Sequence, residues 1–103
     1  MSIFSFMKTQ TDINEGIDLF RAAPGAVLLD VRSKEEYTQG HIPGSVNLPL
    51  NRLAGIKLEK DTPLFVYCLS GARSARACAR LKKNGYSAEN IGALTAYRGT
   101  LEK

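Results

Sequence analysis

Hydrophobic positions along the chain fall into two kinds of segment, short continuous runs and stretches in which apolar residues recur every three or four positions. This alternation is typical of buried strands separated by amphipathic helices. The two strongest continuous runs are residues 26–31 and residues 63–67. Strands that are apolar on both faces occur in sheets covered on both sides, so the pattern predicts an α/β fold around one layered core.

Helix boundaries are marked by capping motifs and by turn residues. A Ser or Asp followed three positions later by Glu is the pattern of a capping box. The motifs are Asp12 with Glu15 and Ser33 with Glu36, and the predicted helices span residues 13–23, 33–40 and 74–84. Weaker patterns predict strands at 4–8, 45–48 and 88–91, turns at 42–44 and 98–99, and a helical turn at 50–54.

Composition limits the classes of protein to which the chain can belong. It has 103 residues, of which 44% are hydrophobic and 23% are charged, and we expect a single domain over residues 1–103. No apolar run approaches the roughly 20 residues of a membrane span, and the first residues do not read as a secretory signal. We therefore expect a cytoplasmic protein with no membrane partner. The net charge of +4 favours small anionic partners, and it is too small to indicate a nucleic-acid binder.

The segment after the second strong strand carries the most chemistry. Cys68 ends the predicted strand, and Leu69, Ser70, Gly71 and Ala72 lead through Arg73 and Ser74 into a helix. Ligands in open α/β sheets bind at the carboxyl ends of the strands, and a loop entering a helix directs backbone N–H groups at an anion. Those dipoles, together with Arg73, would stabilise a thiolate. We therefore predict that Cys68 is a nucleophile in a surface loop.

Other reactive side chains have weaker contexts. Cys78 lies in the middle of a predicted helix and is expected to fill the core, and no Cys or His spacing supports a metal site. His41, the single histidine, lies in a turn sequence where its ring is expected to pack or to bond the backbone. Arg73 is a cation at a helix start, which indicates a local anion.

Two charged residues flank the end of the first strong strand. Arg32 is expected to form a structural ion pair with Glu35 or Glu36. Asp30 is open to two interpretations, a structural partner or a residue that shapes the rim of the site.

Two segments of this sequence resemble the signatures of the rhodanese domain. The first comprises Leu-Asp-Val-Arg at 29–32, Glu-Tyr at 36–37 and Gly-His-Ile-Pro-Gly-Ser-Val-Asn-Leu-Pro at 40–49. The second is the loop Tyr-Cys-Leu-Ser-Gly-Ala-Arg-Ser at 67–74. The likeness extends over about residues 10–99 in the same order. It implies a central parallel sheet of about five strands with helices on both faces.

The resemblance also implies sulfur transfer without a metal or organic cofactor. Cys68 would take a sulfane sulfur from a small anionic donor such as thiosulfate, hold it as a persulfide, and pass it to cyanide or a thiol. The amides from Leu69 to Ser74 would cradle the sulfur, and Arg73 would orient the donor. The chain departs from the family pattern at Ala93 and at Tyr97, where the family often has Gly and Trp, and we expect Tyr97 to take the aromatic packing place.

Three alternatives remain open. The first is a persulfide carrier or docking module that exchanges sulfur with a partner protein. The second is a cysteine phosphatase, and the third is an inactive copy of the domain. Four residues separate Cys68 from Arg73, whereas cysteine phosphatases have five, and this disfavours the second alternative. An exposed Leu69 would suit the first.

Overall fold

The protein's structure is a computed structural model that describes residues 11–103. The strand predicted at 4–8 lies outside the described residues. In chain order the elements are α2 (Ile13–Ala22), β1 (Val27–Asp30), α3 (Lys34–Gln39), β2 (Ser45–Asn47), the 3₁₀ helix η1 (Leu50–Gly55), β3 (Pro63–Cys68), α4 (Ala72–Lys83), β4 (Ser87–Ala93) and the 3₁₀ helix η2 (Leu94–Ala96).

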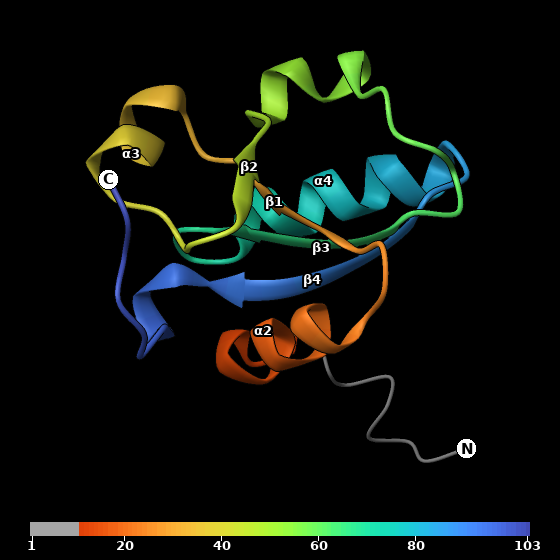
Figure 1. Ribbon diagram of the computed structural model, residues 1–103. Coiled ribbons are helices and arrows are strands. Elements are labelled where there is room, and N and C mark those ends of the chain that lie inside the picture. The colour runs from red at the N-terminus through yellow and green to blue at the C-terminus, as the bar shows by residue number, and fades with distance from the viewer. Residues whose placement is uncertain (1–10) are drawn as a thin grey trace.

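The strands form one parallel sheet in the order β2-β1-β3-β4 (Figure 1). The two strongest apolar runs, β1 and β3, are its central strands, as their continuous burial requires. About five strands were predicted, whereas the described residues form four. The predicted α/β class with a parallel sheet covered by helices is confirmed.

Helices cover the two faces of the sheet and divide the core in two. One face packs against α2, and its buried residues are Ile13, Ile17, Leu28, Ile42, Phe65, Tyr67 and Ile91. The other packs against α4 and η1, and its buried residues are Leu29, Val31, Leu53, Leu64, Val66, Cys68, Ala77, Cys78, Leu81, Tyr86 and Ala88. In β3, alternate residues belong to opposite clusters because successive side chains of a strand point to opposite faces.

Gly16 explains how closely α2 approaches the sheet. A Cβ atom at this position would lie 2.5 Å from Cβ of Ile91 on β4. Any larger residue would therefore force the helix away from the strand. The N-terminus of α2 is capped as predicted, with the side chain of Asp12 accepting a hydrogen bond from the amide of Glu15.

The C-terminal half differs from prediction mainly at element boundaries. Helix α4 begins at Ala72, two residues before the predicted start at Ser74, because Gly71 adopts a left-handed conformation that turns the chain directly into the helix. After η2, a bend occurs at Gly99, close to the predicted turn. The chain then pairs Glu102 with His41 through two backbone hydrogen bonds of 2.8 Å each.

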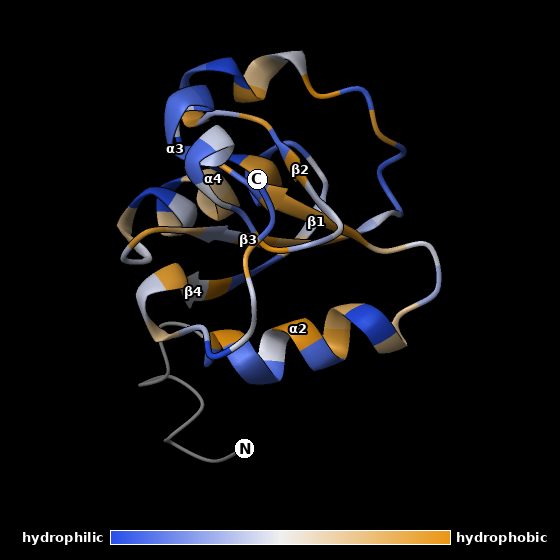
Figure 2. Ribbon diagram, turned by 60° about the vertical axis from the view of Figure 1, so that its left-hand side comes forward, coloured by the Kyte–Doolittle hydropathy of each residue, from blue (hydrophilic) through white to orange (hydrophobic). Residues whose placement is uncertain are grey.

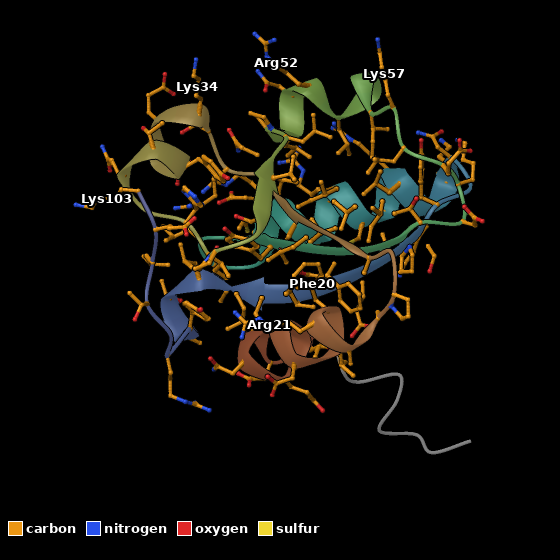
Figure 3. The ribbon with its side chains drawn as sticks, in the orientation of Figure 1. Phe20, Arg21, Lys34, Arg52, Lys57 and Lys103 are labelled. Carbon is orange, nitrogen blue, oxygen red and sulfur yellow. The ribbon has the colours of Figure 1, made fainter. Side chains whose placement is uncertain are left out.

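Polar side chains cover the outside of the helices. Figure 2 shows β1 in the hydrophobic colours and α3 in the hydrophilic ones, while α2 alternates between both. In Figure 3, Lys34, Arg52 and Lys57 point away from the sheet, whereas Phe20 lies between α2 and the sheet. Its ring meets that of Phe65 edge-on at 6.1 Å. Within residues 11–103, none of the helices has the length and apolar character needed to cross a bilayer.

Candidate active site

The candidate nucleophile, Cys68, is the last residue of β3, at the edge of the sheet where the strands end (left in Figure 1). Gly71, three residues after Cys68, has φ 104° and serves as the N-cap of α4. A left-handed conformation costs an ordinary residue roughly 1 kcal/mol or more, so glycine is required for this tight turn. The loop thereby folds back over the end of its own strand.

The sulfur atom of Cys68 accepts hydrogen bonds from the loop around it. The amide of Gly71 donates to Sγ at 3.0 Å and the amide of Ser74 donates at 3.4 Å. Ser74 is the third residue of α4, so its amide would otherwise lack a partner in the first turn of the helix. No side-chain oxygen caps α4, and the sulfur takes the place that such an oxygen occupies in other helices.

The environment of this sulfur favours the thiolate. Burial raises the pKa of the thiol, but hydrogen bonds from the side chain and amide of Ser74 and from the amides of Gly71 and Ser70 bring the pKa below its ordinary value. Ionisation is thus promoted by hydrogen-bond donors of the loop itself. A thiolate is the nucleophilic form of cysteine, so the loop can support attack on an electrophilic sulfur.

The thiol is more deeply buried than the sequence led us to expect. We predicted a nucleophile in a surface loop, yet Cys68 is 0% exposed. The exposed part of the loop begins at the next residue, where Leu69 is 43% exposed, and includes Ser70 and Ala72. The cause is the strand itself, because β3 runs through the sheet centre and its last residue still packs under α4.

The side chain of Arg73 is bound to a carboxylate of the protein itself. Its guanidinium forms two hydrogen bonds with the carboxylate of Glu36 on α3, at 2.7 and 3.0 Å. The anion that the sequence indicated near this helix start is therefore present within the fold. Hydrogen bonds from Arg73 are the main cause that lowers the pKa of Glu36 to about 2.

The family model for the rhodanese-like domain matches residues 13–96. The chain belongs to this family. A rhodanese-like domain protein from Staphylococcus aureus superposes with a TM-score of 0.79 at 26% identity, covering 90% of this chain and 95% of the other. A rhodanese with anions from Escherichia coli superposes with a TM-score of 0.68 at 32% identity, covering 76% and 98%.

Curated relatives of this rhodanese-like domain include named sulfurtransferases. Over 71 residues it is 38% identical to the thiosulfate sulfurtransferase PspE of Escherichia coli, covering 64% of this chain and 68% of that protein. It is 43% identical over 82 residues to YqhL of Bacillus subtilis, an uncharacterized protein, covering 77% of this chain and 61% of the relative. It spans 24% of the adenylyltransferase and sulfurtransferase uba4 of Ogataea parapolymorpha.

The charged residues at the end of β1 of this rhodanese-like domain form a buried ion pair. Arg32 donates to both carboxylate oxygens of Asp30, at 2.7 to 3.1 Å, and to the carbonyl of Gly40 at 2.7 Å. The expected ion pair of Arg32 is present, but its partner is Asp30, because Glu36 is engaged by Arg73. Both members of the pair are buried, which ties the end of β1 to the start of the following turn.

The remaining candidates have the packing roles predicted for them. The ring of His41 stacks on that of Tyr37 at 3.7 Å, and its Nδ1 lies 2.8 Å from the Tyr37 carbonyl. Cys78 is a buried residue of α4 and faces the core, and Tyr97 packs against the cluster under α2. In the part of the chain from Thr11 onward, no group of three His, Cys, Asp or Glu side chains is placed to hold a metal ion.

Two hollows lie near the carboxyl ends of the strands. One of about 710 Å³ between α3 and η1 contains none of the residues 68–74. A second, of about 360 Å³, reaches Arg73 and is also lined by Arg80 and by the apolar side chains of Val31, Pro49 and Leu50. The second hollow adjoins the first turn of α4, so it is the better approach to the loop despite its smaller volume.

Asn90 is a residue of the site that the sequence analysis missed. It lies in β4 opposite Val66, and its Oδ1 is 2.7 Å from Oγ of Ser74. Asparagine is disfavoured in strands, so its position in the middle of a predicted strand was a signal in the sequence. The pairing of β4 with β3 also shifts register between Val66 and Tyr67, which sequence patterns do not predict.

Proposed function

We propose that this rhodanese-like domain is a sulfurtransferase that moves a sulfane sulfur from a donor such as thiosulfate to a thiophile, cyanide or a thiol, through a persulfide on Cys68. The observation that carries the proposal is the sulfur of Cys68 accepting two main-chain N–H donors at the start of α4. The sulfurtransferase names of its relatives support the same class of reaction.

The reaction has two balanced steps. In the first, the thiolate attacks the outer sulfur of thiosulfate, the new S–S bond forms, and the S–S bond of the donor breaks with its electron pair leaving on sulfite. In the second, the thiophile attacks the outer sulfur and the Cys68 thiolate leaves. The loop stabilises the anion at both stages, and a negative outer sulfur would meet the remaining amides of the loop.

Access to the thiol requires a local movement of the loop. Cys68 is buried, while Leu69 and Ser70 beside it are exposed, so displacement of these two residues is the shortest route to Sγ. A reducing compartment such as the cytoplasm would keep this free thiol available.

Because the guanidinium of Arg73 already binds Glu36, it orients an anionic donor while it keeps this contact. Such an anion would approach along the hollow that Arg73 and Arg80 line. Arg73→Ala is expected to weaken loading from thiosulfate more than loading from an uncharged persulfide donor. Equal losses for both donors would assign Arg73 a structural role, through its bond to Glu36.

The decisive experiment is intact-mass analysis after thiosulfate treatment. The wild-type protein should gain one sulfur atom, and cyanide should remove it. Cys68→Ser should gain none, while Cys78→Ser, the same substitution at the other cysteine, should behave as wild type. A sulfur atom that remains in Cys68→Ser would overturn the proposal.

A persulfide carrier that serves a partner protein is the second candidate. The exposed Leu69 next to the nucleophile favours it, and the chain is 39% identical over 61 residues to a putative sulfur carrier protein YrkF of Bacillus subtilis. Steady-state thiocyanate production separates the two. Negligible turnover with thiosulfate and cyanide, combined with stoichiometric sulfur uptake by Cys68 from a persulfidated protein, would establish the carrier.

A further inference from the structure

The hydroxyl of Ser74 has one proton and three neighbouring acceptors. Its Oγ lies 3.4 Å from Sγ of Cys68, 3.1 Å from the carbonyl of Gly71 and 2.7 Å from Oδ1 of Asn90. A hydroxyl donates one hydrogen bond at a time, so these acceptors compete. Which one prevails decides whether the thiolate keeps a side-chain donor.

The amide of Asn90 is held in one orientation. Its Oδ1 accepts from the backbone N–H of Gly92 at 2.9 Å, and its Nδ2 donates to the carbonyl of Gly71 at 3.3 Å. A flipped amide would place a donor against the N–H of Gly92, so the acceptor oxygen faces Ser74. The fixed oxygen and the shortest of the three distances make Asn90 the resting partner of the hydroxyl.

We propose that Asn90 is a positioning residue that decides where the Ser74 hydroxyl donates, and thereby how readily the Cys68 thiol ionises. The proposal rests on Cys68 being the nucleophile of the proposed function. In the neutral state the proton chain runs from the thiol S–H to Oγ of Ser74, and from that hydroxyl to Asn90. In the ionised state the hydroxyl turns to the sulfur, and Oδ1 of Asn90 keeps only the N–H of Gly92.

The same exchange would follow the sulfur through the reaction. Once Cys68 carries a second sulfur, its Sγ has two covalent bonds and the negative charge lies on the outer atom. Sγ then needs the hydroxyl less, and Ser74 returns to Asn90. No proton is gained or lost in this exchange of hydrogen bonds, so it adds no chemical step to the transfer.

Several charged side chains near the loop are engaged by other partners, which leaves the Ser74 hydroxyl as the adjustable donor to the sulfur. Around β3, Arg73 on α4 pairs with Glu36 on α3, and Arg32 pairs with Asp30 at the end of β1. On β4, the carboxylate of Glu89 accepts a hydrogen bond from the hydroxyl of Thr11.

The test is the pH dependence of Cys68 alkylation by iodoacetamide, followed by peptide mass spectrometry in a Cys78→Ala background. Asn90→Ala should lower the midpoint by about half to one pH unit, because ionisation no longer has to break the bond between Ser74 and Asn90. Ser74→Ala should raise the midpoint, since the thiolate loses its side-chain donor. Adding Asn90→Ala to Ser74→Ala should then change nothing further.

Two controls keep the result interpretable. Ser74→Thr retains a hydroxyl, so in this background Asn90→Ala should again lower the alkylation midpoint. If Asn90→Ala fails to fold, Asn90→Leu provides a side chain of similar size that has no acceptor. An equal shift from Asn90→Ala with and without the hydroxyl of Ser74, or a raised midpoint, would overturn the proposal. Alkylation does not require sulfur transfer, so a protein that fails to load sulfur still reports on Asn90.

Discussion

The two cysteines of this domain lie in the same core cluster, and their surroundings shift the thiol pKa in opposite directions. Cys68 is 0% exposed and Cys78 is 4% exposed, so burial does not distinguish them. In the middle of α4, burial raises the pKa of Cys78 to about 12, with only a partial offset from the charge of Lys82. At the end of β3, the hydrogen bonds to Sγ of Cys68 outweigh the same cost and lower its pKa.

Hydrogen-bond donors, rather than exposure, account for the opposite directions of the two pKa shifts. Within an intact helix the backbone N–H groups are already bonded to carbonyls, so Cys78 finds no spare donor. At a helix start the first N–H groups lack partners, and the sulfur of Cys68 takes two donors at the turn into α4.

The sharpest way to break this contrast is to compare the alkylation rates of the two thiols. Near pH 8, iodoacetamide should modify Cys68 at least about 100-fold faster than Cys78, because only the thiolate reacts. Peptide mass spectrometry of a time course measures both rates in one sample. Comparable rates would mean that access through the loop, rather than ionisation, limits the reaction of Cys68.

Removing one hydrogen-bond donor should bring the pKa of Cys68 closer to that of Cys78. Hydrogen bonds to charged groups contribute about 1.5–3 kcal/mol, so Ser74→Ala should raise the pKa of Cys68 by about 1–2 units. Sulfur loading at neutral pH should fall by roughly tenfold or more and recover at higher pH. Single-turnover loading across a pH series measures this change, and Ala75→Gly, at an exposed neighbouring site on α4, controls for weakening of the helix.

Acid should loosen the contact that holds the loop beside Cys68. The pKa of Glu36 falls from 4.5 to about 2 on folding, so its contribution to the free energy of unfolding is complete above pH 4.5 and is lost as the pH falls toward 2. Because the pair with Arg73 is about a third exposed, we expect about 1 kcal/mol. Urea unfolding of the wild type and Glu36→Gln should differ at pH 7 and converge near pH 2.

The smallest effect is expected at the other thiol. Cys78→Ala removes one buried atom and should lower the free energy of unfolding by about 1 kcal/mol. Sulfur loading should stay at the wild-type rate, because this side chain has no part in the hydrogen bonds around Cys68. A clear loss of loading without a loss of stability would give Cys78 a role in transfer.

Local sequence signals predicted most of the fold and singled out Cys68 as the candidate nucleophile. Continuous apolar runs marked β1 and β3, and the capping box of Ser33 and Glu36 is present as expected. The Cys68 loop was recognisable because its strand, glycine and helix start are contiguous. Contacts between distant segments were not predictable in this way, since no local pattern encodes which partner a charged or amide side chain meets.

Glu36 and Asn90 illustrate that limit. Glu36 satisfies its own helix cap by accepting from the amide of Ser33, and nothing in that motif indicates that the same carboxylate also binds Arg73. Asn90 reaches Ser74 only because β4 lies beside β3 and their pairing shifts register. Arg32 was likewise assigned the wrong partner, since its real one is two residues away in a tight turn.

The loop around Cys68 is fastened to segments on either side of it in the chain, to α3 through Glu36 and to β4 through Asn90. A nascent chain that has left the ribosome only as far as the nucleophile lacks the second of these anchors. The amides of Gly71 and Ser74 are also not yet folded around the sulfur of Cys68 in such a chain. We therefore expect the lowered pKa of Cys68 to arise only once the turn into α4 has formed, whichever strand folds last.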